Sequence, residues 1–221
     1  MSVRRTRYEK ELQDVFDSLV LMCRHIESAI ETSVKALIDR DFDLAKEVYE
    51  KDDIIDKMER EIERSILKLL VMDHPVAGDF RSLSAVLKMI TDLERMGDQA
   101  RDIAELIPQF GSEEYVKKLE HIPLMGQIVV QMVKDGVQAY INKDLELARS
   151  LDVTDDKVDE LFNTVMADLT ALIKKTPDNA EQALLLMMIT KYLERIGDHA
   201  VNIGDWVEYA ITGTHPKYQS V

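Results

Sequence analysis

Pairs of acidic residues spaced four apart recur along the sequence. The pairs are Asp52 with Asp56, Glu94 with Asp98, Asp155 with Asp159, and Glu194 with Asp198. Residues i and i+4 lie one turn apart on the same face of an α-helix. Each pair would therefore present two carboxylates together, and carboxylate oxygens are ligands that hard and borderline cations prefer. Such pairs are also common on solvated helix faces, so one pair alone would say little.

The last two pairs are expected to lie at the same height on neighbouring helices. A turn is expected at 176–178, because its proline cannot continue a helical hydrogen-bond ladder. Asp159 lies 17 residues before this turn and Glu194 lies 17 residues after its proline, while Asp155 and Asp198 are each 21 residues away. Antiparallel helices joined by a short turn place equal counts at equal heights. For the first two pairs the counts are 17 and 19, which is a mismatch of ~3 Å at the helical rise.

Four carboxylates at one height would repel one another and should have raised pKa values unless something compensates their charge. Basic residues that could do so are Arg95, Arg195, Lys57 and Lys157. Metal ions bridged by the carboxylates are the other source of compensation. The spacing therefore leaves two interpretations open, a metal site and a solvated acidic surface.

Helical periodicity of the apolar residues dominates the chain and supplies the elements that would carry these pairs. Six long helices are expected, over about 12–37, 44–69, 76–107, 114–142, 145–174 and 179–210. Pro123 is expected in or near the first turns of the fourth helix. The polar tail, residues 213–221, is expected to be loose.

The two halves of the chain are homologous. Residues 92–105 align with residues 192–205 at an offset of 100, and residues 36–45 align with residues 139–148 at an offset of 103. We therefore predict an all-α fold of two repeated three-helix bundles, built from six long antiparallel helices and divided into residues 1–110 and 111–221.

Composition restricts the class of partner. The chain of 221 residues has a formal net charge of −14, which disfavours nucleic acid and direct binding to an anionic membrane surface. Its single cysteine, Cys23, cannot form a disulfide within the chain. No apolar stretch follows the basic residues of the N-terminus, and no apolar run is long enough to span a bilayer, so a cytoplasmic protein is expected.

Two strings resemble the signature of the PhoU family, LERMGDQA at 93–100 and LERIGDHA at 193–200. The resemblance extends over the duplicated acidic pairs and covers residues 8–210. It implies a cytoplasmic negative regulator of phosphate uptake that acts with the high-affinity phosphate ABC transporter. In many bacteria such proteins also act with a membrane sensor histidine kinase. Contact with the membrane would then be indirect, through these partners.

The resemblance also implies metal binding, because some family members hold multinuclear iron or zinc clusters through E(D)xxxD motifs. The implied ligands are Asp52, Asp56, Glu94, Asp98 and Asp102 in the first half, and Asp155, Asp159, Glu194, Asp198 and Asn202 in the second. Asn202 is neutral where Asp102 is acidic, so the two clusters need not be alike. Family members often dimerise, and the segment 184–189 is apolar around most of its helix, so a homodimer is expected.

Other function classes receive less support. A ferritin-like di-iron enzyme needs Glu-x-x-His motifs, and no histidine here has an acidic residue three positions before it. The sequence also shows no glycine-rich phosphate loop and no complete nucleophilic constellation, so no enzymatic activity is expected. Two alternatives stay open: an accessory protein of a low-affinity phosphate transporter, and a metal-free scaffold whose acidic faces dock a basic partner.

Overall fold

The computed structural model describes residues 3–73, 75–111 and 114–218. These residues form seven α-helices and three short 3₁₀ helices, without a strand. The α-helices are α1 (Val3–Asp39), α2 (Phe42–Glu50), α3 (Asp52–Asp73), α4 (Ala77–Leu106), α5 (Ile122–Asn142), α6 (Leu145–Lys175) and α7 (Ala180–Thr212). The 3₁₀ helices are η1 (Ile107–Phe110), η2 (Pro177–Asn179) and η3 (Pro216–Tyr218).

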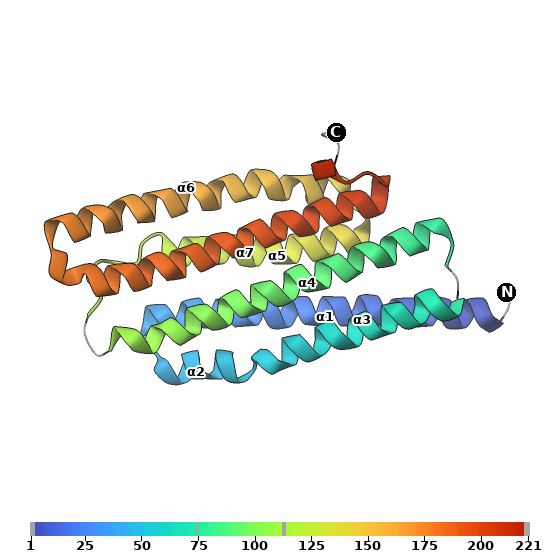
Figure 1. The fold of residues 1–221 in the computed structure, drawn as a ribbon, viewed down its shortest axis with the longest axis horizontal. Coiled ribbons are helices and arrows are strands. Elements are labelled where there is room, and N and C mark those ends of the chain that lie inside the picture. Colours follow the sequence, from blue (N-terminus) through green and yellow to red (C-terminus); the bar gives the residue numbers. More distant parts are fainter. Residues whose placement is uncertain (1–2, 74, 112–113, 219–221) are drawn as a thin grey trace.

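Four of the helices, α1, α4, α5 and α7, form the centre of an elongated molecule (Figure 1). Helix α3 covers α1 and α4 on one side, and α6 covers α5 and α7 on the other. Helices α4 and α7 run antiparallel and form the main contact between the two halves of the chain. The predicted all-α fold of repeated three-helix bundles is confirmed, with α1, α3 and α4 in one bundle and α5, α6 and α7 in the other.

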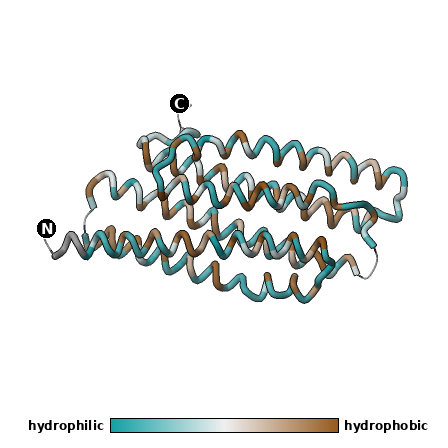
Figure 2. The backbone as a smooth tube through the Cα atoms, turned by 180° about the vertical axis from the view of Figure 1, so that it is seen from behind, coloured by the Kyte–Doolittle hydropathy of each residue, from teal (hydrophilic) through white to brown (hydrophobic). Residues whose placement is uncertain are grey.

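One hydrophobic core runs through both bundles. Its buried side chains come from all seven α-helices, and hydrophobic positions alternate with hydrophilic ones along each helix (Figure 2). Burial of these apolar stripes is the main force that holds the helices together. Because the bundles share this core, the predicted division between residues 110 and 111 stays a prediction.

The same turn occurs once in each half and starts the helix that carries the acidic pairs. Arg40 and Lys143 have φ angles of 56° and 55°, and each is followed by an aspartate that caps the next helix. The side chain of Asp41 accepts a hydrogen bond from the backbone N–H of Leu44 at 2.9 Å. Asp144 accepts one from the N–H of Leu147 at 3.0 Å. Each aspartate satisfies a backbone N–H that has no partner within its helix.

The structure differs from the predicted helices in the first half. The predicted second helix is divided at Lys51, whose backbone N–H bonds to the carbonyl oxygen of Val48 at 3.2 Å. The equivalent part of α6 is continuous. The division places Asp52 and Asp53 in the first turn of α3, where negative charge is stabilised by the free N–H groups of the helix N-terminus.

Two further predictions were wrong in detail. The fourth helix begins at Ile122 rather than near residue 114, because Pro123 fits the first turn of a helix, where its missing N–H costs nothing. The tail is not loose over residues 213–218: His215 is buried and its ring packs against Trp206 with centroids 4.3 Å apart. Residues 219–221 lie outside the described part of the chain.

The close approach of α6 and α7 depends on Gly204. A β-carbon at this position would lie 2.7 Å from the backbone oxygen of Ala148, and a backbone atom cannot rotate away. We expect Gly204→Ala to lower the free energy of unfolding by about 2 kcal/mol, because overpacking outweighs the better helix propensity of alanine. Urea denaturation measures this difference.

Gly78 of α4 provides the matched control, since a β-carbon there would meet no atom within 4 Å. Gly78→Ala should leave stability unchanged or raise it by up to about 1 kcal/mol. Equal effects of the two substitutions would contradict the packing argument for α6 and α7.

Candidate functional site

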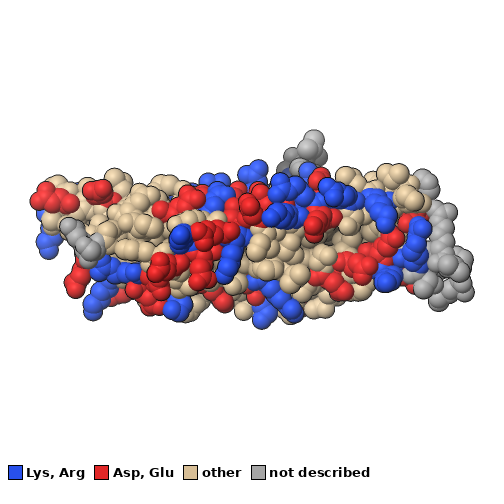
Figure 3. Space-filling view, turned by 90° about the horizontal axis from the view of Figure 1, so that it is seen from below, with Lys and Arg blue, Asp and Glu red and all other residues tan. Residues whose placement is uncertain are grey.

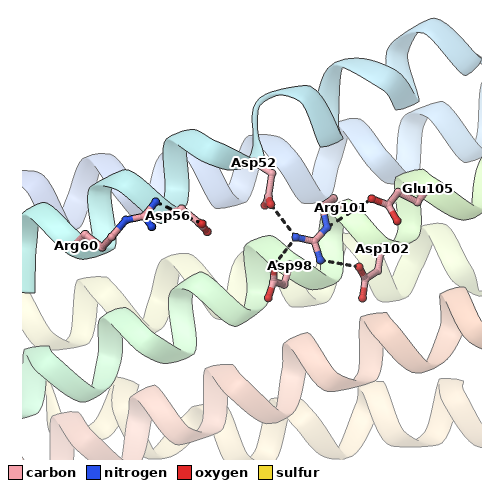
Figure 4. A network of polar contacts seen from close by, with 7 residues as sticks. All are labelled: Asp52, Asp56, Arg60, Asp98, Arg101, Asp102 and Glu105. Carbon is pink, nitrogen blue, oxygen red and sulfur yellow. Dashed lines mark hydrogen bonds and ion pairs between the residues drawn. The ribbon is translucent and has the colours of Figure 1, made fainter.

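The acidic residues of α3 and α4 lie side by side on the outer face of the first bundle (Figure 4). We call Asp52, Asp56, Glu94, Asp98 and Asp102 the first cluster. Asp52 and Asp98 come from different helices, yet both contact the same guanidinium nitrogen. The antiparallel packing of α3 against α4 therefore brings together the residues that the spacing paired.

An arginine that the sequence reasoning did not select lies at the centre of the first cluster. Nη1 of Arg101 donates hydrogen bonds to Oδ2 of Asp52 at 2.8 Å and to Oδ1 of Asp98 at 2.7 Å. Nη2 donates to Oδ1 of Asp102 at 3.1 Å, and Nε lies 3.7 Å from Oε1 of Glu105. Neighbouring carboxylates raise the pKa of Arg101 above its usual value, although burial opposes the shift. One permanent positive charge thus binds three of the five residues in this cluster.

The rest of the first cluster is less well compensated. Asp56 has Arg60 as a partner at 3.5 Å. Partial burial raises the pKa of Glu94, and the charges of Asp98, Glu59 and Asp56 raise it further. The pKa of Asp98 is also raised, mainly by burial, and Arg101 only partly offsets that shift.

The equivalent residues of the second bundle lie between α6 and α7. We call Asp155, Asp159, Glu194, Asp198 and Asn202 the second cluster. Asp155 lies against Gly197, the residue before Asp198, and a β-carbon at position 197 would overlap Oδ1 of Asp155. This placement agrees with the equal counts from the turn at 176–178. It also gives Gly197 a role, since the missing side chain makes room for the carboxylate.

Asp155 is the most perturbed carboxylate of the site. Its Oδ1 is buried and has no hydrogen-bond partner among the residues that the structure describes. Burial raises the pKa of Asp155 to about 7, and the charges of Asp159, Asp198 and Glu194 contribute to the increase. At the position that corresponds to Arg101, offset by 100 residues, the second bundle has Val201. The second cluster therefore lacks the central counter-charge that the first cluster has.

Positive charges in the second bundle contact the edge of the cluster instead of its centre. Lys191 pairs with Glu194. Lys217, from the C-terminal segment, donates to Oδ1 of Asn202 at 2.7 Å and pairs with Asp205 at 3.0 Å. Together with Asp155 and Asp198, Lys217 lines an open cleft of about 500 Å³.

Asn202 also takes part in a contact between the two bundles. Its Nδ2 donates to Oδ1 of Asp92 on α4 at 3.3 Å, and Nδ1 of His199 lies 2.8 Å from the same oxygen. Both oxygen and nitrogen of the Asn202 amide thus have protein partners. Its predicted role as a metal ligand stays a prediction, and Asp92 is a neighbour that the sequence reasoning missed.

The fit of a metal ion differs between the clusters. Within the described ranges, no three His, Cys, Asp or Glu side chains converge into a ready group of ligands. In the first cluster, Arg101 already binds Asp52, Asp98 and Asp102, so a metal does not fit without displacing it. In the second cluster, the orphaned oxygen of Asp155 and the surrounding carboxylates are suitable donors for a cation.

The part of the chain with assigned structure has no helix long and apolar enough to cross a bilayer. This agrees with the charged surface of the α2–α3 side, on which acidic and basic side chains are interspersed (Figure 3).

Comparison with known proteins gives consistent matches over both halves. The family model described as PhoU domain matches residues 19–107 and 122–207. A phosphate-specific transport system accessory protein PhoU homolog from Clostridium acetobutylicum is 35% identical over 210 residues, which cover 95% of this chain and 96% of the relative. A protein of the same name from Aquifex aeolicus is 34% identical, with 96% of each chain covered.

A solved structure matches the fold along nearly its whole length. The crystal structure of PhoU from Pseudomonas aeruginosa superposes with a TM-score of 0.90 at 34% sequence identity, covering 94% of this chain and 100% of the other.

Proposed function

The chain belongs to the PhoU family, and we propose that it is a negative regulator of phosphate uptake and of phosphate-responsive signalling. It would act from the cytoplasm on the high-affinity phosphate ABC transporter, and on a sensor histidine kinase where one is present. The observation that carries the proposal is the match of the PhoU domain to both halves of the chain. The printed names of relatives as phosphate-specific transport system accessory proteins support the transporter as partner.

The proposal assigns no catalytic reaction to the chain. Its conspicuous polar groups are carboxylates and their counter-ions on the outer faces of the bundles, which suit cation binding and contact with a partner. Membrane association would be indirect, through the transporter or the kinase. The interspersed charges in Figure 3 do not favour an acidic docking face on the α2–α3 side, which weakens the metal-free scaffold alternative there.

Deletion of the gene tests the proposed regulation. At high external phosphate, we expect the deletion strain to take up phosphate several-fold faster than the parent, because the brake on the transporter is lost. A plasmid copy of the gene should restore the parental rate. Unchanged uptake at both high and low phosphate would contradict the proposal.

A second deletion separates the high-affinity transporter from a low-affinity one. If the chain acts on the high-affinity transporter, removing that transporter should abolish the extra uptake. Persistence of the extra uptake would support the low-affinity alternative.

We also propose that the second cluster binds metal ions, with iron or zinc expected. Asp155 and Asp159 of α6 and Glu194 and Asp198 of α7 would supply the ligands. A bound cation would bring positive charge to carboxylates that otherwise repel one another, and would thereby hold α6 against α7. The support is the raised pKa and the unsatisfied buried oxygen of Asp155.

The homodimer stays a prediction. Most of the apolar segment 184–189 faces neighbouring helices of the same chain, but Leu184 and Met188 are 56% and 45% exposed. These two residues are spaced i,i+4 and so share one face of α7, where they could contact a second copy. Sedimentation equilibrium tests this prediction, and a monomer at micromolar concentration would contradict it.

A further inference from the structure

We propose that Arg101 is a built-in cation that occupies the first cluster in place of a metal ion, so that the two repeats bind metal unequally. The inference rests on the proposed metal binding of the second cluster. It changes the expectation that follows from the duplicated motif, which is that both repeats carry the same kind of site. The observation behind it is the guanidinium at the centre of one cluster and its absence from the other.

The contacts of Arg101 involve the predicted metal ligands themselves. Its nitrogens lie 2.7–3.1 Å from oxygens of Asp52, Asp98 and Asp102. The side chain of Asp52 is only 14% exposed, and that of Arg101 is 31% exposed, so the interaction is partly shielded from water. Arginine stays charged throughout the physiological pH range and presents five N–H donors in a rigid plane. It therefore cannot release these carboxylates by losing a proton.

A metal ion could enter the first cluster only by displacing this guanidinium. Displacement would leave a partly buried positive charge without its hydrogen-bond partners, next to the incoming cation. Both effects oppose binding, because an unpaired buried charge is costly and like charges repel. Asp56 and Glu94 remain outside the direct contacts of Arg101, but two carboxylates alone make a poorer site than four.

The second repeat has the opposite arrangement. Val201 stands where the first repeat has Arg101, and it lines the cleft beside Asp155 and Asp198. The printed ion pairs of Lys191 and Lys217 involve Glu194 and Asp205, at the edge of the second cluster. The centre, where Asp155 has an unsatisfied oxygen, is thus open to an external cation. Metal loading would then change only the α6–α7 half, while α3 and α4 stay joined by Arg101 at any metal concentration.

Exchange of the two residues tests this inference directly. The wild type, Arg101→Gln and Val201→Arg would be purified without an affinity tag, stripped with a chelator, and dialysed against Zn²⁺. Bound zinc per chain would then be measured by mass spectrometry of the metal. We expect Arg101→Gln to bind at least one more zinc ion than the wild type, because it frees three carboxylates. Val201→Arg should lose the zinc that the wild type binds. Arg101→Lys, which keeps the positive charge, should bind the same number as the wild type.

The outcomes separate this inference from the proposed metal binding itself. If the wild type binds no zinc but Arg101→Gln does, Arg101 is the resident cation and the second cluster is not a zinc site. If Arg101→Gln binds no more than the wild type, the inference is overturned, whether or not the wild type binds zinc. Should Arg101→Gln fail to fold by circular dichroism, Asp52→Asn replaces it: unchanged zinc binding supports the role of Arg101, and a loss of zinc overturns it.

Discussion

Zinc or iron(II) should stabilise the metal-stripped protein, and the second cluster should account for the effect. Binding to the folded state alone raises the free energy of unfolding by about 2.7 kcal/mol when the free ion is at a hundredfold its dissociation constant. The double variant Asp155→Asn, Asp198→Asn should lose this gain. It should nevertheless fold, since replacing repelling carboxylates with amides removes unfavourable interactions. Urea denaturation with and without the ion measures both quantities.

The neighbouring residue Asp156 supplies the control. It lies on the same helix, but its side chain is exposed and belongs to neither cluster. Asp156→Asn removes one negative charge and should keep the full response to metal. If the wild type gains no stability from zinc or iron(II), the carboxylates form an acidic surface only, and the metal proposal fails.

The stability of the metal-free protein should fall as pH rises from 5 to 8, and Asp155 should cause much of the fall. Its pKa is raised from 3.8 to about 7 in the folded state, so the folded protein binds this proton more tightly than the unfolded chain does. The contribution of Asp155 is therefore fully present below pH ~4 and is lost as pH rises through about 7. We expect a loss of about 2 kcal/mol from this residue, allowing for solvent screening of its partly exposed neighbours.

Comparison with Asp155→Asn isolates this contribution. Glu94 and Asp98 also have raised pKa values, so they add a dependence of the same sign that the variant retains. The difference between wild type and variant should change across the pH range, with the variant relatively more stable at pH 8. Parallel stability profiles would show that Asp155 titrates normally. Because metal binding requires the ionised carboxylate, zinc should also release a proton from Asp155 near neutral pH.

The fold could be predicted from the sequence because two independent patterns agree. Apolar residues at helical spacing locate the long helices, and the offsets of 100 and 103 residues show that three of them are repeated. The division of the second helix at Lys51 was not predictable in this way, since the apolar stripe continues through it. The packing of α4 against α7 likewise depends on how the two bundles meet, and local periodicity does not determine that.

The candidate site could be predicted only in part, for a related reason. The i,i+4 pairs and the equal counts from the turn correctly place Asp155 beside Gly197. Arg101 was missed although it follows Asp98 at i+3, because a long side chain can reach several partners and packing selects among them. The contact of His199 with Asp92 joins residues 107 positions apart in the chain, and no spacing rule relates them.

Regulation of the transporter can be measured without the rest of the cell. The high-affinity phosphate ABC transporter would be reconstituted in proteoliposomes oriented with the ATP-binding side accessible, and ATP-dependent uptake of labelled phosphate would be recorded with and without this chain. The proposed function predicts that adding the chain slows uptake in a saturable manner, and that a heat-denatured sample does not. An uptake rate that stays the same at every concentration of the chain would contradict a direct action on this transporter.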